Sequence, residues 1–282
     1  MKVLTIGATG AYARLVVPEL TKRGVRVRAL VRDERKADAA RQQGAHETAV
    51  GDLRDRASLR AAAEGMDGVF HLNPAFAPDE ADMGVAMVET AEAAGVRKFV
   101  FSSVYHPSIS LVNHASKRPV EEALYASDMQ FTVLQPAMFM QNLQGSWSAV
   151  RETARITRPY SKLAKVSFVD YRDVAEVAAL ALTADALAYG TFELCAPGMV
   201  DLVELAALIS EALGRPVEAG EVSFEEGAKT PNMPDQLREG LASMNADYDR
   251  HGFHGGNALV LRAILGREPR TLSQFIQELA RR

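Results

Sequence analysis

The chain has 282 residues, of which 48% are hydrophobic and 24% charged, and its formal net charge is −4 at pH 7. This composition is typical of a globular protein with one large or two modest domains. The balanced charge disfavours a nucleic-acid surface, and no apolar run is as long as a membrane span. A single cysteine and the lack of a signal-peptide pattern in MKVLTIGATG lead us to expect a cytoplasmic protein.

Short apolar runs alternate with helical patterns through the first half of the chain. Such alternation predicts parallel strands joined by right-handed crossovers, with helices on both faces of the sheet. The predicted strands are 2–6, 25–31, a short one ending at residue 52, 68–72, 98–102 and 131–134, and the predicted helices are 13–20, 34–43, 57–64, 83–94 and 119–126. Pro18 fits poorly in the first of these helices.

The alternation stops in the second half of the chain. We expect 138–165 to be irregular, 166–169 and a helix at 174–183 to return to the first layer, and 218–234 to be a surface loop; a strand at 191–195 and helices at 202–213 and near 272–280 are expected to form a second lobe. The predicted fold is therefore α/β: a Rossmann-like parallel sheet over 1–136, rejoined by 166–184, and a smaller, mainly substrate-binding α/β lobe over 137–282.

The most informative segment is the glycine turn GATGAYA at residues 7–13, which lies between the first strand and the first helix. Gly7 permits a tight turn, and Gly10 lets the backbone approach a pyrophosphate. Ala13 takes the place of the third glycine, where helix and strand pack together. The helix N-terminus then offers N–H groups to phosphates. The turn predicts nucleotide binding; the alternative is a purely structural turn.

The end of the second predicted strand indicates which nicotinamide cofactor binds. An NAD site usually carries Asp or Glu there, but this chain has Val31 followed by Arg32. Arg32 can bind a 2′-phosphate, Lys36 can add charge, and Asp33 lies one residue too late for the usual role. These residues favour NADP(H) over NAD(H), unless Arg32 is only a solvated charge.

Asp52 and Leu53 close the third predicted strand, at the sheet edge where an adenine ring would lie. The Asp52 carboxylate could accept a hydrogen bond from the adenine amino group while Leu53 packs on the ring. An aspartate that caps a turn is an equally reasonable interpretation.

Several motifs together resemble the NmrA-like group of atypical short-chain dehydrogenases/reductases. They are GATGAYA (7–13), LVR (30–32), GD (51–52), FSS (101–103), SKRPVEEAL (116–124), FTVLQPAMFMQN (131–142), FVDYRDVAEVA (168–178) and LGREPRTLSQFI (265–276). The resemblance implies an extended Rossmann-like fold with NADP in the first lobe. It carries the family's cofactor contacts onto Gly7, Thr9, Gly10, Ala11, Tyr12, Arg32, Asp52, Leu53, Asn73, Lys117 and Pro136, to which we add Ser102.

The sequence departs from typical short-chain dehydrogenases at one catalytic position. Those enzymes place a proton-donating Tyr four residues before the lysine, whereas this chain has Asn113 before Lys117. Ser102 and Ser103 do stand at the end of the fifth strand, where the partner serine is expected. Lys117 matches the lysine that assists catalysis near the nicotinamide in the isoflavone-reductase-like branch. We therefore expect an atypical oxidoreductase that lacks the Tyr-x-x-x-Lys pair.

Three residues are candidates to replace the tyrosine as proton donor. His114 lies three residues before Lys117, and Tyr105 and His106 follow the serines. A histidine titrates near physiological pH, although loop histidines are commonly just solvated. We assign Lys117, His114, Tyr105 and Ser103 as catalytic candidates.

Aromatic and methionine residues after position 136 suit a pocket for a bulky substrate, or else packing between lobes. The candidates are Phe139, Met140, Trp147 and Tyr160, with Met138 and Phe168 nearby. His251 and His254 lack a ligand pattern, so no metal site is expected.

The leading hypothesis is an NADPH-dependent reductase that transfers hydride to a small or aromatic acceptor: an enone, quinone, carbonyl or imine. One alternative is a non-catalytic NADP-binding redox sensor, and another is a cofactor-assisted isomerase or cyclase. The expected partner is a small molecule, with neither nucleic acid nor membrane. A homodimer or a regulatory protein partner is compatible with the sequence.

Overall fold

The computed structural model describes residues 1–227 and 233–281. The chain divides into two compact units. The first comprises Met1–Pro136 and Tyr171–Glu193, and the second comprises Ala137–Asp170 and Leu194–Arg282. Within the described residues, no helix combines the length and apolar character that crossing a membrane requires.

The first unit is built on a seven-stranded sheet with the order β10-β6-β5-β4-β1-β2-β3. Pairing is parallel from β3 through to β6. The order 3-2-1-4-5-6 is that of dinucleotide-binding folds, whose ligands bind beyond the carboxyl ends of the strands where the order reverses, here between β1 and β4. The strands are β1 (Lys2–Thr5), β2 (Arg26–Val31), β3 (Glu47–Val50), β4 (Gly68–Leu72), β5 (Lys98–Ser102), β6 (Gln130–Pro136) and β10 (Gly190–Leu194).

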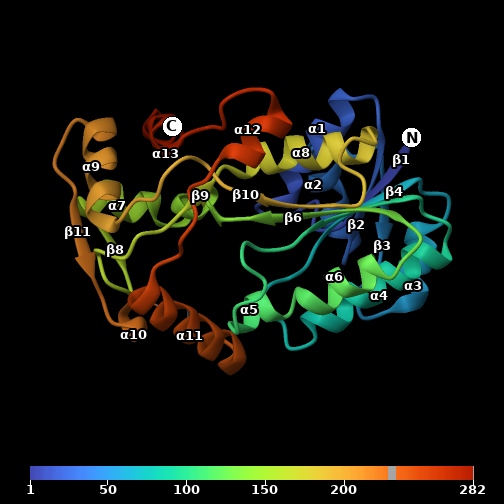
Figure 1. Cartoon of the computed structure of the whole chain (residues 1–282), viewed down its shortest axis with the longest axis horizontal. Helices are drawn as coiled ribbons and strands as arrows, with labels where there is room; N and C mark the ends of the chain where they lie inside the picture. Colours follow the sequence, from blue (N-terminus) through green and yellow to red (C-terminus); the bar gives the residue numbers. More distant parts are fainter. Residues whose placement is uncertain (228–232, 282) are drawn as a thin grey trace. The chain divides into compact units, whose positions relative to one another are not determined.

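Helices cover both faces of this sheet (Figure 1): α1 and α8 pack together on one face, and α3, α4 and α6 on the other. A Cβ atom at Gly84 of α4 would lie 2.4 Å from Val120 Cγ2 of α6, so the glycine allows these two helices to approach closely. The helical segments are η1 (Ala13–Leu15), α1 (Val16–Lys22), η2 (Glu34–Lys36), α2 (Ala37–Gln42), α3 (Arg56–Ala63), α4 (Glu80–Ala93), α5 (Val112–Ala115), α6 (Arg118–Tyr125) and α8 (Tyr171–Thr183).

The second unit contains two small two-stranded parallel sheets, β7 with β9 and β8 with β11. Helix α9 packs against β8, β11 and α13. The elements are β7 (Met138–Phe139), η3 (Met140–Ser146), α7 (Trp147–Thr153), β8 (Arg155–Arg158), β9 (Phe168–Val169), α9 (Leu202–Leu213), β11 (Glu218–Glu221), α10 (Phe224–Gly227), α11 (Asp235–His251), α12 (Leu259–Leu265) and α13 (Leu272–Ala280).

The predicted α/β class, with its parallel sheet and helices on both faces, is confirmed. The poor fit of Pro18 has a simple explanation. The helix begins as the 3-10 turn η1, so Pro18 lies in the first turn of α1, where its missing N–H would have no partner within that helix.

Four predictions about the second half were wrong. Residues 138–165, which we expected to be irregular, contain β7, η3, α7 and β8. Residues 166–169 do not rejoin the first layer, because β9 pairs with β7 and the chain returns to the first unit only at Tyr171. The strand expected at 191–195 in the second lobe is β10, which lies beside β6 in the large sheet. The loop expected at 218–234 instead contains β11 and α10, while 228–232 lie outside the described residues.

Candidate functional site

The glycine turn after β1 has the geometry of a phosphate-binding turn. Gly7 has φ +83°, a conformation that favours glycine, and a Cβ atom there would lie 3.2 Å from the Ala13 Cβ. The Gly10 N–H donates to the Gly7 carbonyl at 2.8 Å, and both Gly10 and Ala11 are exposed. The turn therefore presents accessible backbone just before a helix, and these residues fit a dinucleotide pyrophosphate.

Arg32 follows β2 and is exposed, with no hydrogen bond or ion pair to any residue that the structure describes. Asp33, in contrast, caps η2 by accepting from the Arg35 N–H at 2.9 Å and forms an ion pair with the Arg35 side chain. Hydrogen bonds from Arg35 hold the pKa of the Asp33 carboxyl below its usual value. Asp33 is thus occupied, which leaves the Arg32 guanidinium for a 2′-phosphate.

Asp52 and Leu53 have structural roles in the turn after β3. The Asp52 carboxylate accepts from the Arg54 N–H at 2.9 Å, and the Asp52 N–H donates to Ser58 Oγ at 3.1 Å. Leu53 is half-buried against the core of the first unit. Both features match the capping interpretation, while a contact with adenine stays a prediction.

Four buried side chains meet where α4 and α6 approach, and we call them the Lys117 cluster: His71, Asn73, Glu80 and Lys117. Lys117 is 4% exposed and forms an ion pair with Glu80, which is 1% exposed. Asn73 Nδ2 donates to the Glu80 carbonyl at 2.9 Å, and Asn73 Oδ1 contacts His71 Nε2. A chain of polar contacts therefore runs from β4 to the lysine.

Burial shifts the pKa values of both basic groups in the cluster. It lowers the pKa of Lys117 to about 8, because the charged ammonium loses its solvation. Burial also lowers the pKa of His71 to about 4, so this imidazole is neutral at physiological pH. A lysine with a pKa near 8 can release a proton in a reaction near neutral pH.

The two serines at the end of β5 are engaged differently. Ser102 Oγ accepts from the Tyr171 hydroxyl at 3.0 Å, and the Tyr171 ring lies 5.7 Å from that of Tyr12 in the glycine turn. Ser103 Oγ donates to the carboxylate of Glu121. Burial raises the pKa of Tyr171, which keeps its hydroxyl protonated.

The predicted proton donors differ in burial and in their contacts, and the backbone of His114 is bonded to a residue of the Lys117 cluster. His114 is fully buried on α5 with Nδ1 3.1 Å from the His106 carbonyl oxygen, and the Lys117 N–H donates to the His114 carbonyl at 3.0 Å. The Tyr105 ring lies 4.1 Å from that of His106, whose imidazole is 3.3 Å from Glu193.

The predicted substrate residues all belong to the second unit. Met140 is fully buried and Trp147 is 8% exposed, whereas Phe139 and Tyr160 are half-buried. The buried Trp147 Nε1 donates to no residue that the structure describes. The Tyr160 ring lies 5.9 Å from that of Tyr248, and burial raises the pKa of Tyr160. The apolar surfaces and the indole N–H suit an aromatic ligand, and this assignment stays a prediction.

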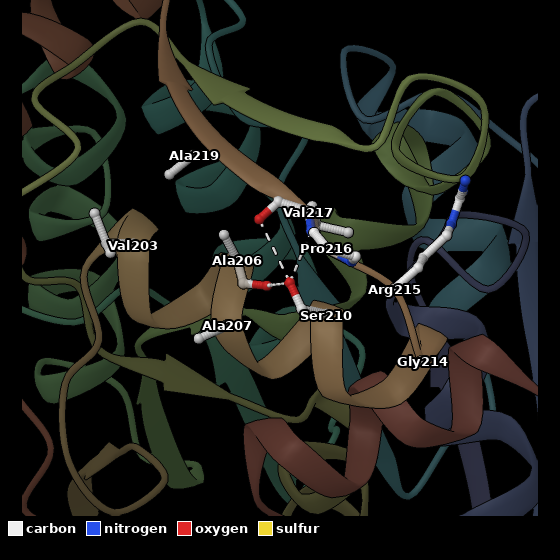
Figure 2. A pocket seen from close by; sticks show the side chains of 9 residues that line it. All are labelled: Val203, Ala206, Ala207, Ser210, Gly214, Arg215, Pro216, Val217 and Ala219. Carbon is white, nitrogen blue, oxygen red and sulfur yellow. Dashed lines mark hydrogen bonds between the residues drawn. The ribbon is translucent and has the colours of Figure 1, made fainter.

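A separate open groove of about 670 Å³ runs between α9 and β11 (Figure 2). Its lining is small and apolar, and the Ser210 hydroxyl bonds to the Ala206 carbonyl and the Val217 N–H. Arg215 points away from Ser210. Phe139, Met140, Trp147 and Tyr160 are not among its lining residues, so we do not assign this groove as the substrate pocket.

Sequence reasoning missed Glu80, Glu121 and Tyr171. Glu80 meets Lys117 across 37 positions, Ser103 meets Glu121 across 18, and Tyr171 reaches Ser102 across 69. Glu80 begins α4, which also carries Asp82, Glu89 and Glu92, so the sequence does not single it out, and its partner cannot be inferred from spacing.

The comparison with protein families agrees with the strand order and the glycine turn. The NmrA-like family matches residues 1–276. The chain belongs to the NmrA-like family. This family membership covers both units, including the part of the second unit that carries the predicted substrate residues.

Individual relatives extend the likeness over the whole length. An NAD(P)H azoreductase from Xenophilus azovorans is 32% identical, over 97% of this chain and 96% of that protein. A (4-alkanoyl-5-oxo-2,5-dihydrofuran-3-yl)methyl phosphate reductase from Streptomyces griseus is 31% identical, over 99% and 98%. The crystal structure of the NADPH-dependent quinone oxidoreductase QOR2 from Escherichia coli, in complex with NADPH, has a TM-score of 0.85 at 24% identity and covers 99% of both chains.

Proposed function

We propose that this protein is an NADPH-dependent reductase of conjugated or aromatic acceptors, such as azo compounds, quinones and enones. The observation that carries the proposal is the exposed glycine turn before α1, together with Arg32 after β2, which pairs with no described residue, on a sheet of dinucleotide-binding order. The names of two full-length relatives, an NAD(P)H azoreductase and an unsaturated-lactone phosphate reductase, support the acceptor class, and the first of them also supports a nicotinamide cofactor.

The first unit would hold the cofactor mainly through its backbone. The turn with Gly7, Thr9, Gly10, Ala11 and Tyr12 would bind the pyrophosphate, and Arg32 would bind the 2′-phosphate. The remaining contacts that we propose along the carboxyl edge are Asp52, Leu53, Asn73, Ser102, Lys117 and Pro136. NADPH supplies the hydride when bound.

Lys117 is the residue that we propose to act on the acceptor. Its ammonium can stabilise the negative charge that develops on the acceptor heteroatom and can donate the proton there. Asn113 cannot take this role, because an amide is no acid at neutral pH. His114, buried one turn earlier, is the second candidate, and Tyr105 and Ser103 would line the site.

The second unit would supply the acceptor pocket through Phe139, Met140, Trp147 and Tyr160. We also propose a cytoplasmic location, because the chain has a single cysteine, Cys195, and so no internal disulfide that would require an oxidising compartment. A homodimer or a regulatory partner stays a proposal.

The test is NADPH oxidation at 340 nm against an azo dye, a quinone, an enone and an imine, with thermal shifts measured in parallel. A ligand at 100 times its dissociation constant adds about 2.7 kcal/mol to the free energy of unfolding, so NADPH should raise Tm while ATP and FAD do not. Turnover of at least one acceptor supports the proposal. A clear NADPH shift without any turnover would favour the redox sensor instead.

A further inference from the structure

We propose that Glu80 is the positioning residue of this site: one carboxylate oxygen holds the Lys117 ammonium, and the other holds the loop between β4 and α4 at Phe76. The inference rests on the proposed function, because it takes Lys117 to face the cofactor and acceptor. It goes further in giving a role to a residue outside the cofactor-binding motifs. Both bonds are made by a single buried side chain.

The first bond sets the charge of the lysine. The Lys117 and Glu80 side chains are only 5% and 2% exposed, and an unpaired charge at that depth is strongly disfavoured. An ammonium has three donors, and Lys117 uses one of them for Glu80. It makes no other hydrogen bond to a described residue, so two donors are available to a ligand. The carboxylate therefore keeps a buried lysine charged and leaves it free to interact.

The second bond sets the shape of the loop. Phe76 has φ +65°, a left-handed conformation that is rare for a bulky residue and persists only where its surroundings hold it. Its N–H donates to Glu80 Oε2 at 2.9 Å. The loop follows β4 at the carboxyl edge, beside the point where the strand order reverses and where cofactors bind in this fold. Glu80 thus places the half-buried Phe76 ring at that edge.

Other ionisable groups around the lysine are engaged elsewhere. On β4, burial keeps His71 neutral, with a pKa of about 4. Asp79, next to Glu80, pairs with Arg54, and Glu121 on α6 accepts from Ser103 and Gln135. On α5, His114 lies against the His106 carbonyl. Among the described residues, Glu80 is the one carboxylate within ion-pair distance of Lys117.

Removing the negative charge has a defined consequence. Burial lowers the pKa of Lys117, and the negative charge of the Glu80 carboxylate in contact with the ammonium opposes that shift, so the pKa should fall when the charge is removed. The site would then lose its ammonium at neutral pH. A carboxylate that stabilises the first unit without contacting Lys117, such as Asp185, would leave this pKa unchanged.

The experiment is a pH titration of the lysine ¹³Cε signals in the full-length, cofactor-free protein labelled with ¹³C-lysine. Lys117→Met identifies the signal. The variants are Glu80→Gln, Glu80→Ala and the matched control Asp185→Asn, which removes the carboxylate from another ion pair of the first unit, with the largely buried Lys98. Hydrogen exchange of the Phe76 amide is measured on the same samples.

The apparent pKa of Lys117 should fall by at least one unit in Glu80→Gln and Glu80→Ala and stay unchanged in Asp185→Asn. Exchange of the Phe76 amide should quicken by at least 10-fold in Glu80→Ala. An unchanged Lys117 pKa in a folded Glu80→Gln protein overturns the proposal. If neither variant folds, Glu80→Asp replaces them: its shorter side chain should lower the pKa by a smaller amount and speed Phe76 exchange, and no change in either would overturn the proposal.

Because these signals are read without cofactor, they do not depend on turnover. Where an acceptor is found, the alkaline limb of kcat should move to lower pH in Glu80→Gln and remain in place in Asp185→Asn. A shifted Lys117 pKa without activity on any acceptor would count against the proposed function and still support the role of Glu80.

Discussion

The glycine turn and the Lys117 cluster are two parts of the same unit that are built in different ways. The turn uses seven consecutive residues, 7–13, and presents exposed backbone, so the spacing of its glycines carries most of the information. The Lys117 cluster draws buried side chains from β4, the loop after it, α4 and the start of α6. We infer that the turn governs cofactor affinity and the cluster governs turnover.

The largest effect that we expect is the loss of NADPH affinity when the glycine turn is disrupted. Gly10→Val should weaken NADPH binding at least 10³-fold, because even a Cβ atom at this position would lie 3.1 Å from the Gly7 carbonyl oxygen, and the branched side chain would fill the pyrophosphate space. Binding is measured by titration calorimetry on protein whose circular dichroism is native. Gly145→Ala, at an exposed glycine with no atom within 4 Å of the added Cβ, is the control. Normal NADPH affinity in folded Gly10→Val would show that the turn is only structural.

The next effect separates turnover from affinity. Lys117→Met should lower kcat about 10²-fold, the lower range for general acid catalysis, with a much smaller change in the dissociation constant of NADPH. Asn113→Ala should change kcat only modestly. Parallel losses of affinity and kcat in Lys117→Met would contradict the division of labour between turn and cluster.

The pH profile shows which group donates the proton. A donor must be protonated, so with a Lys117 pKa of about 8 the wild-type kcat should fall as pH rises through 8, and Lys117→Met should lose this limb. A limb that remains in Lys117→Met and disappears in His114→Ala would instead identify His114 as the donor. Rates are compared at saturating NADPH from pH 5.5 to 9.5.

Cofactor preference tests the part of the site just beyond the turn. Arg32→Ala should weaken NADPH binding by about 1.5–3 kcal/mol, the range for a hydrogen bond to a charged group, and leave NADH binding nearly unchanged. The exposed, unengaged Arg32 is the reason for this selectivity. Lys36→Ala should have a smaller effect in the same direction. Equal losses of binding free energy for NADPH and NADH would contradict the assignment of Arg32 to the 2′-phosphate.

The smallest effect is on stability and concerns the cluster. The pKa of His71 is lowered to about 4 in the folded protein, so between pH 6.5 and 4 the unfolded chain binds the extra proton and the native state does not. The free energy of unfolding should therefore decrease as the pH is lowered from 6.5 to 4, and at pH 5 it should be about 2 kcal/mol below its value at neutral pH. His71→Gln should flatten that dependence, as measured by urea unfolding. An equally steep fall in the variant would assign it to other groups.

The sequence predicted the first unit better than the second for a physical reason. Buried parallel strands and the helices between them leave strong periodic patterns, and α9 and α13 were likewise found within a residue or so. Short strands leave almost none: β7 and β9 have two residues each, and β9 pairs with β7 across about thirty positions. The position of β10 depends on its neighbour β6 and not on its own residues.

The same distinction holds for the site. Arg32 and the glycine turn could be found from local spacing, whereas the Lys117–Glu80 pair joins the starts of α4 and α6, two helices whose close approach Gly84 allows. Asp52 shows the limit of local reasoning: the sequence allowed either a contact with adenine or a cap on the turn, and the contacts of Asp52 match the cap.

The central claim, hydride transfer to an organic acceptor, is tested most directly with NADPH carrying deuterium at C4 of the nicotinamide. The acceptor should be an enone, because the transferred atom then forms a stable C–H bond instead of an exchangeable O–H bond. We expect one deuterium in the product, detected by mass spectrometry, from only one of the two stereospecifically labelled cofactors. Saturated product without deuterium from either cofactor, or NADPH binding with no product from any acceptor of the panel, would contradict the account.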